Sequence, residues 1–130
     1  MAIATGCCAV APAAKTVQTA GRLDPPAPPA SVYPREARDL PEVRFAELPR
    51  EAKETLRLIE EGGPFPYERD GQPFENREGI LPDRPSRYYR EYTVETPGSD
   101  DRGARRFVSG EAGERYYTKD HYDSFSRVVR

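Results

Sequence analysis

Two side chains of this sequence are suited to moving a proton, those of Glu91 and His121. Glu91 lies in the middle of the aromatic segment 88–94 (YYREYTV), where a carboxylate is costly unless it is paired or functional. A carboxylate beside arginines stays ionised and can accept a proton, and Arg102 and Arg106 follow Glu91 closely along the chain. The single histidine, His121, belongs to the residue type that titrates near neutral pH and can donate a proton. These residue types predict general acid–base chemistry.

The same residues also allow purely structural explanations. Glu91 can form a cross-strand salt bridge with an arginine of the next strand, and a lone histidine is more often a surface or core residue than a catalyst. The spacing alone leaves both alternatives open. No cluster of His, Cys and Asp at metal-ligand spacing occurs, so we expect neither a metal nor another cofactor.

The hydrophobic spacing predicts one helix, at residues 49–61. Proline suits the first turn of a helix, and Ala52, Leu56 and Ile59 then recur at helical spacing. Gly62 and the glycine after it supply the stop signal.

Beyond Pro82 the pattern becomes typical of β-strands. The predicted strands span residues 88–94, 105–109, 115–118 and 122–129. Within the first of them, Glu91 shares a face with Tyr89 and Thr93. We therefore expect an α+β fold, with one N-terminal helix packed on a multi-stranded antiparallel sheet.

The N-terminal part of the chain has a different composition. Residues 24–34 (DPPAPPASVYP) favour an extended linker, so we expect a leader at residues 1–39 and a single domain at residues 40–130. Removing residues 1–38 is expected to leave folding nearly unchanged, because this segment has little to bury. The small apolar residues 2–14 allow three interpretations: the remnant of an export signal, a lipoprotein box ending at Cys7, or a disordered leader.

Charge and length limit the possible functions. The net charge is -2 and the isoelectric point is about 5.5, so any phosphate binding must depend on local clusters of arginine. No apolar segment approaches the ~20 residues of a membrane-spanning helix. Cys7 and Cys8 are adjacent and are the only cysteines, so the domain must be stable without a disulfide bond.

Short motifs spread over residues 48–125 resemble the microbial guanyl-specific ribonucleases, in particular the ribonuclease Sa type and more distantly barnase. They occur in the family's order with similar gaps. The matching segments are 63–67 (GPFPY), 70–71 (DG), 76–78 (NRE), 81–82 (LP), 91–94 (EYTV), 96–98 (TPG), 102–103 (RG), 105–106 (RR) and 116–122 (YYTKDHY). One departure concerns a disulfide of ribonuclease Sa between its first strand and its C-terminus, because Arg44 stands near the place of the first cysteine.

The resemblance implies cleavage of single-stranded RNA after guanosine, without a metal, in two steps. The ribose 2′-hydroxyl first attacks its own phosphate to form a 2′,3′-cyclic phosphate, and water then opens this ring to a 3′-phosphate. By matching motifs, Glu91 resembles the family's base and His121 its acid. Arg102 and Arg106 resemble the arginines that bind the phosphate, with Arg77 and Tyr122 assisting.

The resemblance places guanine recognition at residues 74–78. Glu78 is expected to accept two hydrogen bonds from the guanine ring imino group and exocyclic amine. The backbone N–H groups of Glu75, Asn76 and Arg77 are expected to bind the carbonyl oxygen of the base. Phe74 or Tyr122 is expected to stack on it.

Two other roles remain open on this fold. One is a non-catalytic RNA- or nucleotide-binding module. The other is a ribonuclease toxin that is neutralised by a cognate inhibitor. The expected partners are single-stranded RNA and a barstar-like protein inhibitor. The protein is expected to be secreted and to act as a monomer.

Overall fold

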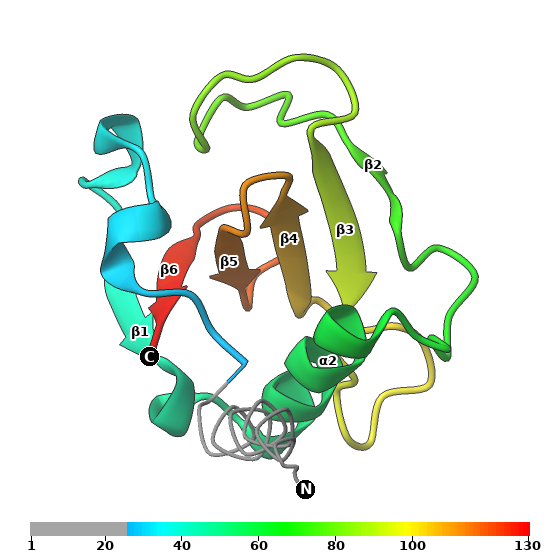
Figure 1. Cartoon of the computed structure of the whole chain (residues 1–130). Helices are drawn as coiled ribbons and strands as arrows, with labels where there is room; N and C mark the ends of the chain where they lie inside the picture. The colour runs from blue at the N-terminus through cyan, green and yellow to red at the C-terminus, as the bar shows by residue number, and fades with distance from the viewer. Residues whose placement is uncertain (1–25) are drawn as a thin grey trace, which may run out of the picture.

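A six-stranded sheet with the order β1-β6-β5-β4-β3-β2 forms the centre of the computed structural model, which describes residues 26–130 (Figure 1). Neighbouring strands are antiparallel except for β1 and β6, which are parallel. The strands are β1 (Glu42–Arg44), β2 (Gln72–Phe74), β3 (Tyr89–Thr93), β4 (Arg106–Gly110), β5 (Arg115–Thr118) and β6 (Ser126–Val129). One helix on a mostly antiparallel sheet confirms the predicted α+β class.

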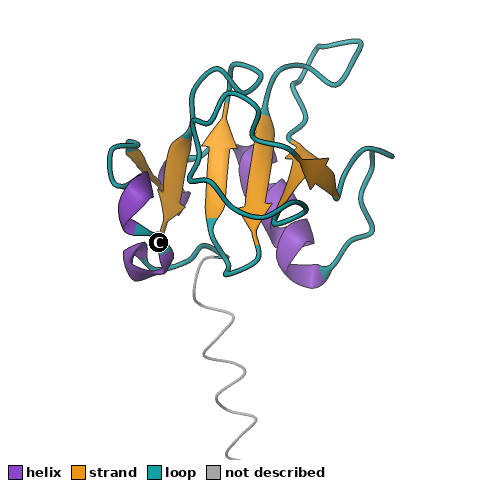
Figure 2. Ribbon diagram, turned by 90° about the horizontal axis from the view of Figure 1, so that it is seen from above, coloured by secondary structure: helices purple, strands orange, loops and turns teal. Residues whose placement is uncertain are grey.

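Helix α2 (Arg50–Glu61) packs on one face of the sheet (Figure 2). Pro49 directly precedes it, and Gly62 ends it in a left-handed conformation with φ 85°, which glycine adopts without strain. The backbone N–H groups of Gly62 and Gly63 both donate to the carbonyl oxygen of Leu58, which closes the last turn.

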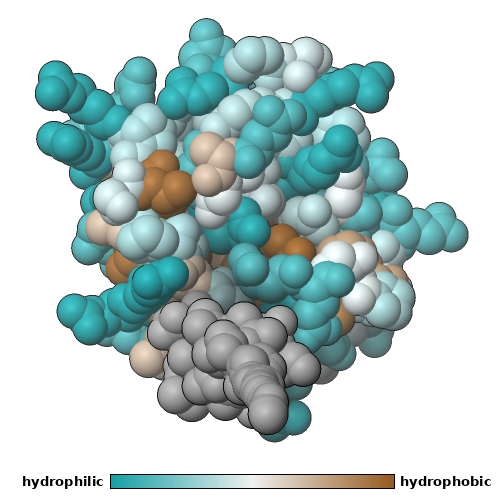
Figure 3. Space-filling model, viewed as in Figure 1, coloured by the Kyte–Doolittle hydropathy of each residue, from teal (hydrophilic) through white to brown (hydrophobic). Residues whose placement is uncertain are grey.

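Alternation along β3 separates two layers of the molecule. Tyr89, Glu91 and Thr93 share one face, as the sequence predicts. They are buried on the side opposite α2, whereas Arg90 is exposed. The core beneath α2 contains Phe45, Leu48, Ala52, Leu56, Val94, Phe107, Tyr117 and Val128. The core on the other face contains Tyr33, Ala37, Leu81, Tyr89, Val108, Tyr116, Phe125 and Val129. Hydrophilic residues predominate on the surface seen in Figure 3.

The sequence prediction misses β1 and β2, and it begins the last strand too early. β1 and β2 have three residues each, which is too short for an alternating pattern to be visible. Residues 119–125 form turns rather than strand, and the backbones of His121 and Tyr122 have φ values of 56° and 76°. The last strand therefore starts at Ser126.

The packed part of the chain begins before the predicted boundary at Leu40. Two short 3-10 helices, Ala30–Val32 and Arg35–Ala37, lie against the sheet, and Ala27, Tyr33 and Ala37 are buried. The Tyr33 hydroxyl donates to the carbonyl oxygen of Val128 or of Arg115, and it accepts from the backbone N–H of Arg115 at 3.2 Å. Residues 27–37, here called the N-terminal strap, were expected to be linker. A few apolar side chains among the prolines are enough to anchor them.

The predicted export signal, lipoprotein box and cysteine pair all fall within residues 1–25, outside the described residues. Within residues 26–130, no helix is long and apolar enough to cross a membrane.

Candidate active site

Glu91 lies in the middle of β3, on the sheet face opposite α2. It pairs with Val108 across β3 and β4, and only 8% of its surface is exposed. One carboxylate oxygen, Oε1, accepts a hydrogen bond from the Tyr122 hydroxyl at 2.8 Å and lies 3.4 Å from Nη2 of Arg102. Glu91 is therefore paired with an arginine, but the partner is Arg102 of the loop and not an arginine of the next strand.

Arg102 reaches Glu91 from the loop between β3 and β4. Its Nε and Nη2 donate to Oγ1 of Thr93 at 2.9 and 2.7 Å, which fixes the guanidinium beside the carboxylate. Glycine at position 103 allows the loop to pass close to Thr96, because its φ is 71° and a Cβ atom there would lie 2.3 Å from Oγ1 of Thr96.

Arg106 is buried, with 3% of its surface exposed, and it faces the same side of the sheet as Glu91. Its Nη1 donates to the carbonyl oxygens of Gly103 and Arg105, both at 2.8 Å. Its Nε has no hydrogen-bond partner within residues 26–130. Burial, and then the charge of Arg102, lower the pKa of Arg106 below its usual range. A buried arginine with a free donor and a second cation nearby is suited to an anionic ligand.

His121 and Tyr122 lie in a tight turn after β5. The Tyr122 backbone N–H donates to Oγ1 of Thr118 at 3.1 Å, and the His121 backbone N–H donates to the carbonyl oxygen of Ala104 at 2.9 Å. The imidazole is exposed and packs edge-on against the Tyr122 ring, with 5.0 Å between the ring centroids. Burial and the neighbouring Glu91 raise the pKa of Tyr122 above its usual range, so the hydroxyl keeps its proton at neutral pH.

Residues 74–78 form a loop at the end of β2. Asn76, with φ 55°, shapes this loop: its side chain donates to the carbonyl oxygen of Leu81 at 2.9 Å and accepts from the Leu81 N–H at 3.1 Å. The backbone N–H groups of Glu75, Asn76 and Arg77 donate to no other group in the described part of the chain. They are free to bind a ligand. The Phe74 ring lies 4.8 Å from the Tyr122 ring, centroid to centroid.

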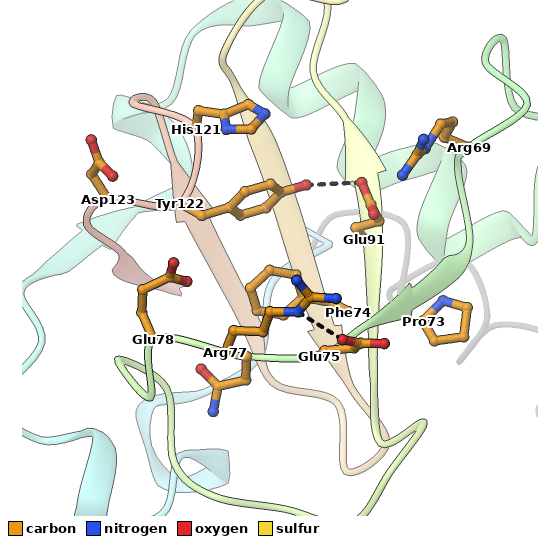
Figure 4. A pocket seen from close by; sticks show the side chains of 11 residues that line it. Arg69, Pro73, Phe74, Glu75, Arg77, Glu78, Glu91, His121, Tyr122 and Asp123 are labelled. Atoms are coloured by element: carbon orange, nitrogen blue, oxygen red, sulfur yellow. Dashed lines mark hydrogen bonds and ion pairs between the residues drawn. The ribbon is translucent and has the colours of Figure 1, made fainter.

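A cavity of about 440 Å³ connects these elements (Figure 4). Glu91 and His121 line its upper part in this view, and residues 74–78 line its lower part. The predicted residues in its lining are Phe74, Glu75, Asn76, Arg77, Glu78, Glu91, His121 and Tyr122. Arg102 and Arg106 do not line the cavity, although Arg102 contacts Glu91 directly.

Three residues of this lining, Arg69, Pro73 and Asp123, are not predicted from the sequence. Arg69 points into the cavity from the side of Glu91 (Figure 4) and makes no side-chain ion pair or hydrogen bond with residues 26–130. It lies in a turn-rich loop with no periodicity, so the sequence pattern gave no reason to choose it. Among the described residues, no group of three or more His, Cys, Asp or Glu side chains could hold a metal ion.

The family model described as ribonuclease matches residues 34–129, and the chain belongs to this family. The chain is 66% identical over 88 residues to guanyl-specific ribonuclease St of Saccharopolyspora erythraea, covering 68% of this chain and 87% of the relative. It is 59% identical over 87 residues to guanyl-specific ribonuclease Sa3 of Kitasatospora aureofaciens, covering 66% of this chain and 62% of the relative. It is 54% identical over 87 residues to guanyl-specific ribonuclease Sa of the same organism, covering 66% of this chain and 91% of the relative.

Solved structures of ribonuclease Sa2 share the fold. Sa2 in complexes with mononucleotides superposes with a TM-score of 0.69 at 50% sequence identity, covering 70% of this chain and 95% of that chain. Sa2 with guanosine-2′-cyclophosphate gives a TM-score of 0.66 at 50% sequence identity, covering 68% of this chain and 95% of that chain. The predicted resemblance to the ribonuclease Sa type is thereby confirmed.

Proposed function

We propose that this protein is an endoribonuclease that cleaves single-stranded RNA on the 3′ side of guanosine. The observation that carries the proposal is the cavity, which brings a buried carboxylate, a histidine and a loop with free backbone donors into one site. Relatives with 54–66% identity are named guanyl-specific ribonucleases, which supports the same base preference here.

The first step is an intramolecular transfer of the phosphate. Glu91 takes the proton of the ribose 2′-hydroxyl, and the 2′-oxygen forms a bond to phosphorus. His121 gives a proton to the departing 5′-oxygen as its bond to phosphorus breaks. In the second step the roles reverse: His121 takes a proton from water, the hydroxide oxygen opens the cyclic phosphate, and Glu91 returns the proton to the 2′-oxygen.

Positive charge near Glu91 supports this chemistry because negative charge accumulates on the phosphate oxygens in the transition state. Arg102 and Arg106 are already fixed by Thr93 and by backbone carbonyls, so they need little reorganisation when the phosphate arrives. Arg77 lies on the loop at the opposite wall of the cavity and approaches the phosphate from that side.

Guanine is recognised by the loop at residues 74–78. The free N–H groups of Glu75, Asn76 and Arg77 donate to the carbonyl oxygen of the base, and the Glu78 carboxylate accepts from its ring N–H and amine. Adenine presents an amine where guanine presents the carbonyl, so these donors would face another donor. The Phe74 and Tyr122 rings provide the apolar surface for stacking.

Digestion of a defined RNA with EDTA present tests this proposal. We expect products that end in guanosine 2′,3′-cyclic phosphate and then in guanosine 3′-phosphate, with DNA left intact. An RNA whose guanosines are 2′-O-methylated serves as the control, because it lacks the attacking hydroxyl. Cleavage of this control, or product ends at other bases with equal frequency, would contradict the mechanism.

We also propose that the protein acts outside the cell, because the small apolar residues 2–14 resemble the end of an export signal. Fractionation of the producing culture tests this: activity is expected in the medium. Activity confined to the cell pellet would contradict it.

A further inference from the structure

Arg77 differs from the other two arginines of the proposed site in the group that it binds. Arg102 is bound to Thr93 and Glu91, and Arg106 to backbone carbonyls. The Nε atom of Arg77 instead donates to Oε1 of Glu75 at 2.9 Å, in a pair within the same short loop (Figure 4). Both side chains are exposed, Arg77 by 80% and Glu75 by 67%.

Glu75 also contributes negative charge to the space that RNA must enter. It lines the 440 Å³ cavity together with Glu91 and Arg77. It lines two further cavities as well, of about 320 and 430 Å³, which share Pro73 with the first. A phosphate that approaches Arg77 therefore also approaches the Glu75 carboxylate.

We propose that Glu75 competes with the RNA phosphate for the guanidinium of Arg77, and thereby sets how tightly the site holds substrate and product. This inference rests on the proposed function. A carboxylate and a phosphate bind a guanidinium in the same way, through a fork of two parallel N–H groups. Glu75 occupies Nε, so the fork formed by Nε and a terminal nitrogen becomes available to phosphate only after Glu75 withdraws.

The pair is weak enough to be displaced. Exposed ion pairs contribute little to stability, since water and salt screen them. The competition is therefore expected to change affinity by about two- to fivefold at low salt and to fade as ionic strength rises. It acts on phosphate binding, in the substrate and in the 3′-phosphate product alike, and leaves the proton transfers by Glu91 and His121 untouched.

Glu75→Gln tests the competition because the amide oxygen still accepts from Arg77 while the charge is lost. For this variant we expect KM for the dinucleotide GpC and Kd for 3′-GMP to fall about two- to fivefold. The gain is expected to disappear at high salt. Glu75→Ala is expected to show at least the same gain in affinity, since it frees Arg77 completely.

Two comparisons separate this effect from a general change of charge. Asp123→Asn removes another negative charge from the same cavity, but Asp123 is not paired with Arg77. It is expected to give a smaller gain than Glu75→Gln. In an Arg77→Ala background, Glu75→Gln is expected to give no gain, because the contested guanidinium is absent.

Unchanged or weaker binding of 3′-GMP by Glu75→Gln would overturn the inference. So would an equal gain in the Arg77→Ala background or an equal gain from Asp123→Asn. Because 3′-GMP affinity is measured without turnover, these outcomes are distinct from failure of the proposed function, which would appear as a wild-type protein that does not cleave RNA.

Discussion

The hydroxyl of Tyr122 donates a hydrogen bond to the carboxylate of Glu91 over 2.8 Å. The bond joins β3 to the turn that carries His121, so it ties the proposed base to the segment of the proposed acid. It also occupies the Oε1 atom of Glu91, one of the two oxygens that could accept the proton of a ribose 2′-hydroxyl. Glu91 is therefore held in position before substrate arrives.

Glu91→Gln should separate this role from that of the second carboxylate, Glu78. The amide of the variant fills the same space but cannot take a proton, so turnover is expected to fall by a similar factor after every base. Binding of 3′-GMP is expected to survive. Glu78→Gln is expected instead to weaken discrimination of guanine from adenine by about 1–3 kcal/mol, the value of one good bidentate base contact.

The measurements for these two variants are turnover of GpC and ApC and affinity for 3′-GMP. Uniform slowing by Glu78→Gln, or loss of base preference in Glu91→Gln, would reverse the assignment of the two carboxylates.

His121→Ala is expected to reduce turnover of RNA by roughly 10²–10⁴, the usual loss for a positioned acid or base. A substrate whose 5′ leaving group is already a weak base needs no proton from the protein. The loss measured on such a substrate should be much smaller. Equal losses on both substrates would mean that His121 binds phosphate or supports the turn.

Tyr33→Phe is expected to lower the free energy of unfolding by about 1–3 kcal/mol, since the hydroxyl bonds to the backbone of β5 and β6 and each lost bond costs about 0.5–1.5 kcal/mol. Denaturant unfolding measures the change. Tyr92→Phe is the control, because the half-buried Tyr92 hydroxyl makes no hydrogen bond within residues 26–130.

Removal of residues 1–38 is expected to lower Tm by more than Tyr33→Phe does, because it also deletes the buried Ala27 and Ala37. An unchanged Tm in the truncated protein would show that the N-terminal strap contributes nothing to stability.

Alkaline pH is expected to destabilise the protein. Burial raises the pKa of several tyrosines above the ordinary value near 10, namely Tyr33, Tyr88, Tyr89, Tyr116, Tyr117 and Tyr122. Above pH 10 the unfolded chain loses these protons while the folded protein keeps them, so stability present below pH 10 is lost as pH rises further. Tyrosinate absorbance and circular dichroism measured together should show late-titrating tyrosines ionising only as the protein unfolds. Ionisation of all eight tyrosines near pH 10 with the fold intact would contradict this.

The sequence predicts those parts of the fold whose patterns are local. Helix α2 and strands β3 to β5 follow from apolar spacing and from glycine and proline at their ends. β1 could not be predicted in this way, because its three residues become a strand only by pairing with β6, more than eighty residues later. The burial of Tyr33 could not be predicted either. The residues around it are rich in proline and resemble a linker, and only the tertiary structure shows that its ring is buried.

The candidate site was predictable as a set of residues but not as a geometry. Spacing placed Glu91 on one strand face with Tyr89 and Thr93 and near arginines, and the resemblance to a family added His121 and residues 74–78. No pattern indicated that Arg69 points into the same cavity or that Arg77 is paired with Glu75. Such contacts depend on loop conformations, which hydrophobic periodicity does not report.

Because β6 lies between β1 and β5, the sheet cannot be completed until β6 has been synthesised. β6 is the last strand of the sheet to leave the ribosome, and β1, the first strand, has no neighbour in the sheet until β6 arrives. Contacts between such distant segments form late and slowly. His121 and Tyr122 lie a few residues before β6, so the sheet and the cavity are completed together. A nascent chain that lacks this segment has neither β6 in its sheet nor the proposed acid, so the proposed site can act on RNA only after this segment has been made.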